Sequence, residues 1–232
     1  MDEALAVLSD EQRRSVDKFS VDMHDAFIAS AKRMCPNADI SVDRFHVVQH
    51  VNHAFDEVRR AEFKKARDSQ NTFLQGMLAP SRRFILVERR RQRSRLETKM
   101  LSQLRSLNDA IHSAMLLTEQ FHAALDKTDL SAFRRALLDW YLIVRESKLK
   151  PFRKLARMIT KYRSYIETYI TSRLTTAVSE GLNNKIKTLR RMAYGYTNPT
   201  SFKNKILQRC GYLNHYSINT NDLFCHCPTN AP

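Results

Sequence analysis

The sequence predicts a mostly α-helical protein with a small β element. Only four glycines and six prolines occur among its 232 residues, and so few helix-breaking residues favour long helices over an all-β fold. Apolar side chains recur at helical spacing through most of the chain, whereas strict alternation is confined to two short N-terminal stretches. This length suggests one large domain or two small ones. Hydrophobic residues make up 43% of the sequence, so the chain is not disordered by composition.

The first strand is expected close to the N-terminus, after a helix. Residues 2–18 carry a weak helical stripe of leucine and valine. Phe19, Val21 and Met23 then alternate with polar residues, which is the pattern of a half-buried strand. A second helix is expected over residues 26–34, because a proline and an asparagine follow and stop it.

The second strand is expected over residues 38–42, and it ends at Asp43. A long helix follows over residues 45–65, with four valines and Phe55 on one face. This β-α-β unit is too short for a nucleotide-binding domain, and it has no glycine-rich loop. We therefore expect two short strands that form the edge of a larger sheet.

The remaining chain is predicted to be helical up to about residue 210. After a break at residues 69–80, helices are expected at residues 81–125, 128–146, 151–169, 180–194 and 201–209. Aromatic rings alternate with basic residues in the third of these helices, and they serve either base stacking or packing of the helical region. The polar tail that follows lacks periodicity and is expected to be loose.

The formal net charge of +15 is concentrated in two blocks. Residues 59–105 hold fourteen Lys and Arg against four Asp and Glu, and residues 145–209 hold sixteen against three. So much positive charge predicts a polyanionic partner, nucleic acid or an anionic membrane surface, although a solvated surface is the alternative. The densest cluster is a run of arginines that we expect to contact phosphates, namely Arg89, Arg90, Arg91 and Arg93.

Membrane insertion and zinc binding are not expected from the sequence. No apolar run approaches the ~20 residues that a membrane-spanning helix requires, and no signal peptide is apparent. The four cysteines are not spaced as a disulfide framework, so we expect a cytoplasmic protein. The run Cys225-His226-Cys227 is too tight for a tetrahedral zinc site, because it has one residue between its cysteines where such sites usually have two to four.

A polar face with one acid distinguishes the expected helix near residue 180. Glu180 shares this face with an amide and two cations, Asn184, Lys187 and Arg191, opposite an apolar stripe. A glutamate in a first turn can simply complement the helix dipole. That explanation does not cover the amide and the cations. A metal-dependent site that acts on phosphodiesters would explain the acid, the amide and the cations together, because carboxylates hold Mg²⁺ while Lys and Arg hold phosphates.

Two long motifs carry a resemblance to a known family. The C-terminal motif is SEGLNNKIKTLRRMAYGY, and the N-terminal one is VDMHDAFIASAKRMCPNADISVDRFHVVQHVNHAFDEVRR. Both resemble motifs of the DDE transposases of the ISL3 type, the IS204/IS1001/IS1096/IS1165 group, and they occur in the same order. The resemblance covers about residues 19–210.

The resemblance implies roles for individual residues. Asp22 matches the second catalytic aspartate and Glu180 the catalytic glutamate, which together would bind Mg²⁺ or Mn²⁺. Asp43 and His46 match a D-x-x-H motif; Asp43 could also be a metal ligand, and His46 could instead cap or orient its helix. The DNA contacts expected on the closing helix include the amide and cations of its polar face, Asn184, Lys187 and Arg191, together with Asn183 and Arg190 of the same motif.

The resemblance also implies a fold, a truncated RNase H-like α/β core interrupted by a large all-helical insertion. Residues 1–58 would form part of the core, residues 59–172 the insertion, residues 173–210 the closing helix, and residues 211–232 a loose tail. The family's first catalytic aspartate has no match, since only twenty-one residues precede Asp22.

We therefore expect a C-terminal fragment of a transposase that is inactive alone. Its partners would be the DNA ends of an insertion element, together with further copies of itself or the missing N-terminal half. The alternative is a DNA-binding helical module without catalysis that modulates an intact transposase. A plain helical interaction protein, in which the charge is incidental, is the third hypothesis.

Overall fold

The computed structural model describes residues 1–85, 95–174, 177–193, 195 and 198–210, with the side chains of residues 80–85, 97 and 177–180 outside that description. The described chain is mostly helical with one small parallel sheet, as the sequence predicts. It divides into two compact units, residues 1–175 and residues 176–232. No described helix is long and apolar enough to cross a membrane.

The first unit begins with a β-α-β arrangement that matches the predicted order. Its elements are α1 (Asp2–Leu5), α2 (Asp10–Arg14), β1 (Lys18–Val21), α3 (Asp25–Met34) and β2 (Asp39–Val42). The two strands are parallel, with Phe19 opposite Ile40 and Val21 opposite Val42. The predicted single helix over residues 2–18 is wrong, because Ser9 accepts a hydrogen bond from the Gln12 backbone N–H and starts a new helix there.

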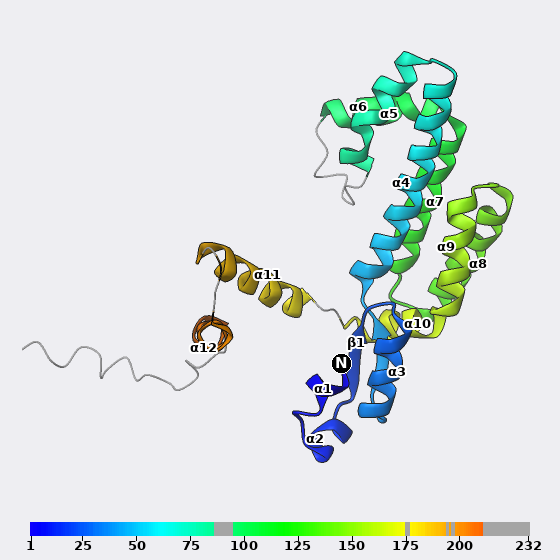
Figure 1. Ribbon diagram of the computed structural model, residues 1–232. Coiled ribbons are helices and arrows are strands. Elements are labelled where there is room, and N and C mark those ends of the chain that lie inside the picture. Colours follow the sequence, from blue (N-terminus) through cyan, green and yellow to red (C-terminus); the bar gives the residue numbers. More distant parts are fainter. Residues whose placement is uncertain (86–94, 175–176, 194, 196–197, 211–232) are drawn as a thin grey trace, which may run out of the picture. The chain divides into compact units, whose positions relative to one another are not determined.

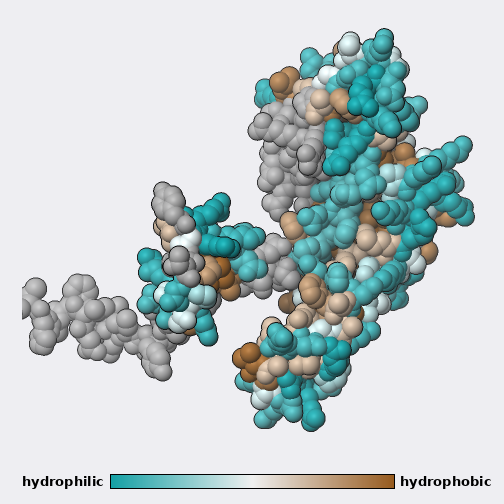
Figure 2. Space-filling view, viewed as in Figure 1, coloured by the Kyte–Doolittle hydropathy of each residue, from teal (hydrophilic) through white to brown (hydrophobic). Residues whose placement is uncertain are grey.

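The helical part of the first unit consists of seven helices among the described residues. They are α4 (Arg44–Asp68), α5 (Thr72–Ile85), α6 (Arg95–Leu107), α7 (Asp109–Leu125), α8 (Leu130–Glu146), α9 (Lys150–Lys161) and α10 (Arg163–Ser172). Figure 1 shows α4 beside α7 and α8 beside α9. The exposed surface of this unit is largely hydrophilic on the face that Figure 2 presents.

Side-chain caps explain two of the differences between these helices and the prediction. The predicted break at residues 69–80 is short, because Asn71 accepts the backbone N–H of Leu74 and α5 begins directly after it. Asn108 accepts the N–H of Ile111 in the same way and separates α6 from α7 within the predicted helix 81–125. The predicted helix 151–169 is divided at Tyr162, which ends α9 and precedes α10.

One continuous apolar core holds the helices together. Trp140, Phe121, Phe133 and Phe152 are fully buried in it, and the Trp140 indole N–H donates to the Leu117 carbonyl at 2.9 Å. Tyr162 belongs to a second cluster with Val21, Ile28 and Ile40 around the sheet. The rings of α9 and α10 therefore support the packing alternative rather than base stacking.

A buried charge network joins α4 to α5. Asp56 and Arg59 are almost fully buried, and the Arg59 guanidinium donates to the Asp56 carboxylate at 2.7 Å and to the Leu78 carbonyl at 3.0 Å. Arg60 donates to the other Asp56 oxygen at 2.8 Å. Burial alone would raise the pKa of Asp56, but the hydrogen bonds from the two guanidiniums outweigh it and lower that pKa.

Replacing Asp56 is expected to destabilise the first unit strongly. Asp56→Ala leaves the buried Arg59 charge without its carboxylate, so the free energy of unfolding should fall by about 3–5 kcal/mol. Asp68→Ala is the matched control on the same helix, because Asp68 is exposed and lies 3.7 Å from exposed Arg67. The control should change stability by less than about 0.5 kcal/mol. Urea unfolding followed by circular dichroism measures both, and equal effects would contradict the prediction.

The second unit is a helical pair among its described residues. Helix α11 (Ala177–Met192) contacts α12 (Pro199–Cys210), and the chain passes between them through Gly195. Gly195 has φ of +106°, a backbone conformation that residues with a Cβ atom rarely adopt. The predicted closing helix near residue 180 and the short helix after it are both present.

Candidate active site

The carboxyl ends of the two parallel strands bring two acids to one edge of the sheet. Asp22 directly follows β1, and Asp43 directly follows β2. Val21 and Val42 are in register, and the Asp43 backbone N–H donates to the Val21 carbonyl at 3.2 Å. Because parallel strands end at the same edge, the two acids lie beside one another. This edge is where open α/β sheets commonly bind ligands.

His46 joins this edge from the first turn of α4. Asp43 occupies the N-cap position of that helix, so the spacing of three residues places the imidazole one turn further on. The His46 Nε2 atom contacts the Asp22 Oδ1 atom. The structure thus brings together three of the residues predicted from sequence, with Asp43 buried and Asp22 accessible to solvent.

The polar face of α11 is exposed as the helical spacing predicts. Asn184, Lys187 and Arg191 of this face lie exposed, as do Asn183 and Arg190 beside it. On the apolar side, Ile186 and Leu189 are partly buried and Leu182 is exposed. Glu180 lies in the first turn of α11, and its side chain falls outside the described residues. Pairing of Glu180 with Asp22 therefore stays a prediction.

The match of most of the chain to a known family decides where it belongs. Residues 1–206, most of the chain, match the family model described as a transposase, of the DDE and ISL3 type. The chain belongs to the ISL3-type transposase family. Its two quoted motifs both fall within the matched residues, so the resemblance drawn from them is confirmed.

Individual relatives agree with the family assignment. The chain is 26% identical over 188 residues to the transposase of insertion sequence element IS1001 from Bordetella parapertussis, covering 81% of the chain and 46% of that protein. It is 23% identical over 210 residues to the transposase of insertion sequence element IS1557 from Mycobacterium tuberculosis. That match covers 83% of the chain and 47% of that protein. The chain spans about half the length of these curated relatives. No solved structure matches it.

The donor atoms at the sheet edge fit a divalent metal only in part. Mg²⁺ prefers oxygen ligands and binds through one or two carboxylates together with water, so the exposed Asp22 carboxylate suits it. Among the described residues, however, no three His, Cys, Asp or Glu side chains are close enough to form a metal site. The described residues therefore show one accessible carboxylate at this edge, that of Asp22, and no complete metal site.

The structure adds cations that sequence reasoning missed in the second unit. A cavity of about 350 Å³ lies between α11 and α12, and its lining includes Asn184 together with Lys185 and Arg209. The sequence could have indicated Lys185, because it directly follows the predicted contact Asn184. It could not have indicated Arg209, which lines the cavity only because α12 packs against α11. The predicted contacts Arg89, Arg90, Arg91 and Arg93 lie outside the described residues.

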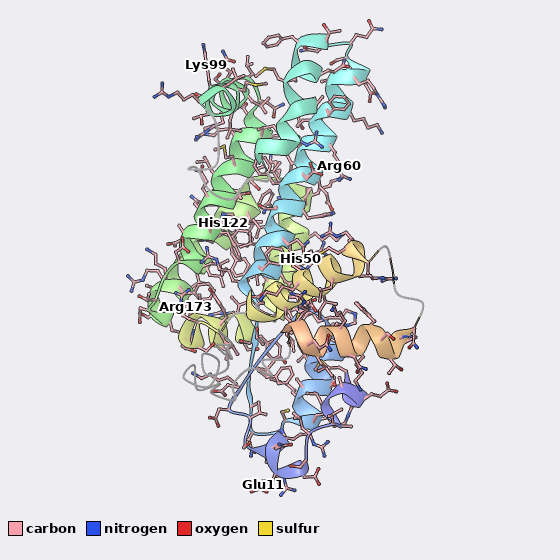
Figure 3. The ribbon with its side chains drawn as sticks, turned by 90° about the vertical axis from the view of Figure 1, so that its left-hand side faces the viewer. Glu11, His50, Arg60, Lys99, His122 and Arg173 are labelled. Carbon is pink, nitrogen blue, oxygen red and sulfur yellow. The ribbon has the colours of Figure 1, made fainter. Side chains whose placement is uncertain are left out.

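Two further histidines of α4 were not among the site residues predicted from the sequence. His50 and His53 follow His46 at four and seven residues, so helical spacing alone could have linked them to the site. Figure 3 shows His50 in the N-terminal half of α4, with Arg60 further along. Burial lowers the pKa of His50, and the nearby imidazoles of His53 and His46 lower it further, whereas Asp22 opposes them.

Proposed function

We propose that this chain provides part of the catalytic domain of an insertion-sequence transposase, which cleaves and joins DNA strands at element ends with divalent metal ions. Asp22 and Glu180 are two of its metal-binding carboxylates. The observation that supports this most is the meeting of Asp22, Asp43 and His46 at the carboxyl edge of a parallel sheet within a chain of this family.

The proposed chemistry is in-line displacement at a phosphodiester. Mg²⁺ or Mn²⁺ supplies charge neutralisation and activates the attacking oxygen when bound. Asp22 holds metal through its exposed carboxylate, Asp43 supports this edge from a buried position, and His46 orients the Asp22 carboxylate through its contact with Oδ1. Cations of α11 hold phosphates on either side of the bond that breaks.

The proposed fold is a partial RNase H-like core, with β1, β2 and α11 in it and an insertion that runs from the last turns of α4 to the end of α10. This assignment follows the family resemblance, and the order of the observed elements agrees with it. Residues 1–58, 59–172 and 173–210 are the corresponding segments. Its partners would be further copies of the chain or the other half of a family transposase.

The 232-residue chain is expected to show no strand cleavage by itself. The transposase chemistry needs three carboxylates, and the family resemblance assigns only Asp22 and Glu180 to the set, so the metal ions would be held too weakly. The test is incubation of the purified chain with end sequences of an ISL3-type element and Mg²⁺ or Mn²⁺. Nicked DNA that disappears in the Asp22→Ala variant would contradict the expectation.

A second function, DNA binding without catalysis, is favoured by the exposed cations of α11 and by the net charge of +15. Such a module would compete with an intact transposase for element ends. Both functions require DNA binding. Only the catalytic function predicts that DNA cleavage appears when a second protein supplies the third carboxylate in trans. A transposase half added in trans therefore separates them.

A further inference from the structure

A cavity between α4 and α9 lies outside the candidate active site. Its volume is about 350 Å³, within the range of about 300–1,000 Å³ that is common for small-molecule sites. His50, His53 and Glu57 line it from α4, and Lys154, Leu155 and Met158 line it from α9. All of these residues belong to the first unit.

The cavity begins one helical turn beyond the acid edge of the sheet. His46 contacts Asp22, and His50 and His53 follow it by four and seven residues on the same helix. At 1.5 Å per residue they lie about 6–11 Å further along the α4 axis. That is roughly two to three nucleotide steps of about 3.4 Å along a DNA strand. A strand cleaved beside Asp22 would therefore reach the cavity within a few nucleotides.

The lining combines an apolar floor with a polar rim. Leu155 is buried and Met158 is partly buried against the core, so the floor of the cavity is apolar and its accessible part belongs mainly to Met158. The rim carries two imidazoles and the exposed Lys154 ammonium, while the Glu57 carboxylate is held by His53 at 3.1 Å. Because the described residues contain no three-ligand metal cluster, a metal is not the occupant that this lining favours.

The chemistry of the lining matches a single nucleotide. Unpaired bases stack on apolar and aromatic surfaces, histidine included, and exchange hydrogen bonds through their edges. Lys154 provides one cation for the adjoining phosphate. The opening of the cavity toward solvent on an exposed stretch of α4, where His50 and His53 are both accessible, leaves room for the rest of the strand.

We propose that this cavity holds one unpaired nucleotide of the DNA strand on which the active site acts. Its base lies over Leu155 and Met158 beside His53, and its phosphate contacts Lys154. The inference rests on the proposed function, since it assumes DNA at Asp22. The site would fix the position of the strand relative to the carboxylates and favour DNA whose end is already unpaired.

The test compares two DNA duplexes of the same sequence, one fully paired and one with a single unpaired fluorescent base analogue near its end. The full chain should bind the unpaired form about tenfold more tightly, which corresponds to one stacked base, and should change the emission of the analogue. Lys154→Ala and His53→Ala should remove this preference. Lys64→Ala is the control, because it removes one exposed cation of α4 outside the cavity.

Each other outcome decides against the inference. Equal binding of paired and unpaired DNA, with unchanged emission, overturns it but leaves the proposed function standing. If Lys154→Ala and Lys64→Ala reduce the preference for unpaired DNA equally, the preference comes from the overall positive charge and not from the cavity. Equal affinity for free deoxyadenosine monophosphate and for the oligonucleotide would indicate a site for free nucleotides. Absence of DNA binding in every form overturns both the inference and the proposed function.

Discussion

Asp22→Ala is expected to abolish DNA strand cleavage when the chain is supplemented in trans with the N-terminal half of a family transposase. Asp22 lies accessible at the carboxyl end of β1, where its carboxylate would hold a catalytic metal ion. Loss of that ligand removes several kcal/mol of transition-state stabilisation, and each 1.4 kcal/mol is about tenfold in rate. We therefore expect the cleavage rate to fall by about a thousandfold or more, as measured on end-labelled element DNA.

Asp39→Ala is the matched control for this variant. Asp39 is exposed and begins β2, so it lies at the opposite end of the same small sheet. It should cleave at the rate of the unmodified chain, and both variants should retain the far-ultraviolet circular dichroism of the parent. If Asp22→Ala cleaves within a few-fold of the control, Asp22 does not hold a catalytic metal ion.

Alanine at Lys187, Arg190 and Arg191 together is expected to weaken the salt dependence of DNA binding. These three cations are exposed along α11. Each phosphate contact contributes about 0.9 to the slope of log affinity against log salt, so the slope should become shallower by about 3. Fluorescence anisotropy with labelled duplex DNA, titrated at several salt concentrations, measures the slope directly.

A control variant that loses three positive charges outside α11 distinguishes direct phosphate contacts of α11 from a general electrostatic attraction between the chain and DNA. Lys64, Lys127 and Arg145 are exposed on the helical part of the first unit, and their replacement by alanine removes the same three charges. This control should keep most of the parent slope. Equal slopes for both triple variants would show that α11 has no special role, and a flat slope for the parent would favour the interaction-protein hypothesis.

Much of the secondary structure could be predicted because local patterns determine it. Alternation around Val21 and Ile40 predicted both strands, and the apolar face around Val51 predicted α4. Three of the failures occurred where one polar side chain starts a helix. In the sequence, nothing distinguishes Ser9, Asn71 and Asn108 from other polar residues. Only the hydrogen bonds that their side chains accept from backbone N–H groups show that they cap helices.

The candidate site was predictable to the extent that it lies in consecutive elements. Asp22 and Asp43 meet because two parallel strands end together, and His46 follows from helical spacing. The cavity beside His53 was not predictable, because Lys154 and its neighbours on α9 lie about a hundred residues away in sequence. Long-range packing of α4 on α9 has no local sequence signal.

We propose that Asp22 and Glu180 share metal ions when the chain is bound to DNA. Two ions about 4 Å apart, each about 2 Å from its ligand, would bring the two carboxylates within about 8 Å. Spin labels on cysteines replacing Met23 and Gly181, in a chain without its native cysteines, measure this separation by electron paramagnetic resonance. With DNA and Mg²⁺ present, we expect strong dipolar broadening. A broad distribution of long distances under the same conditions would contradict the account.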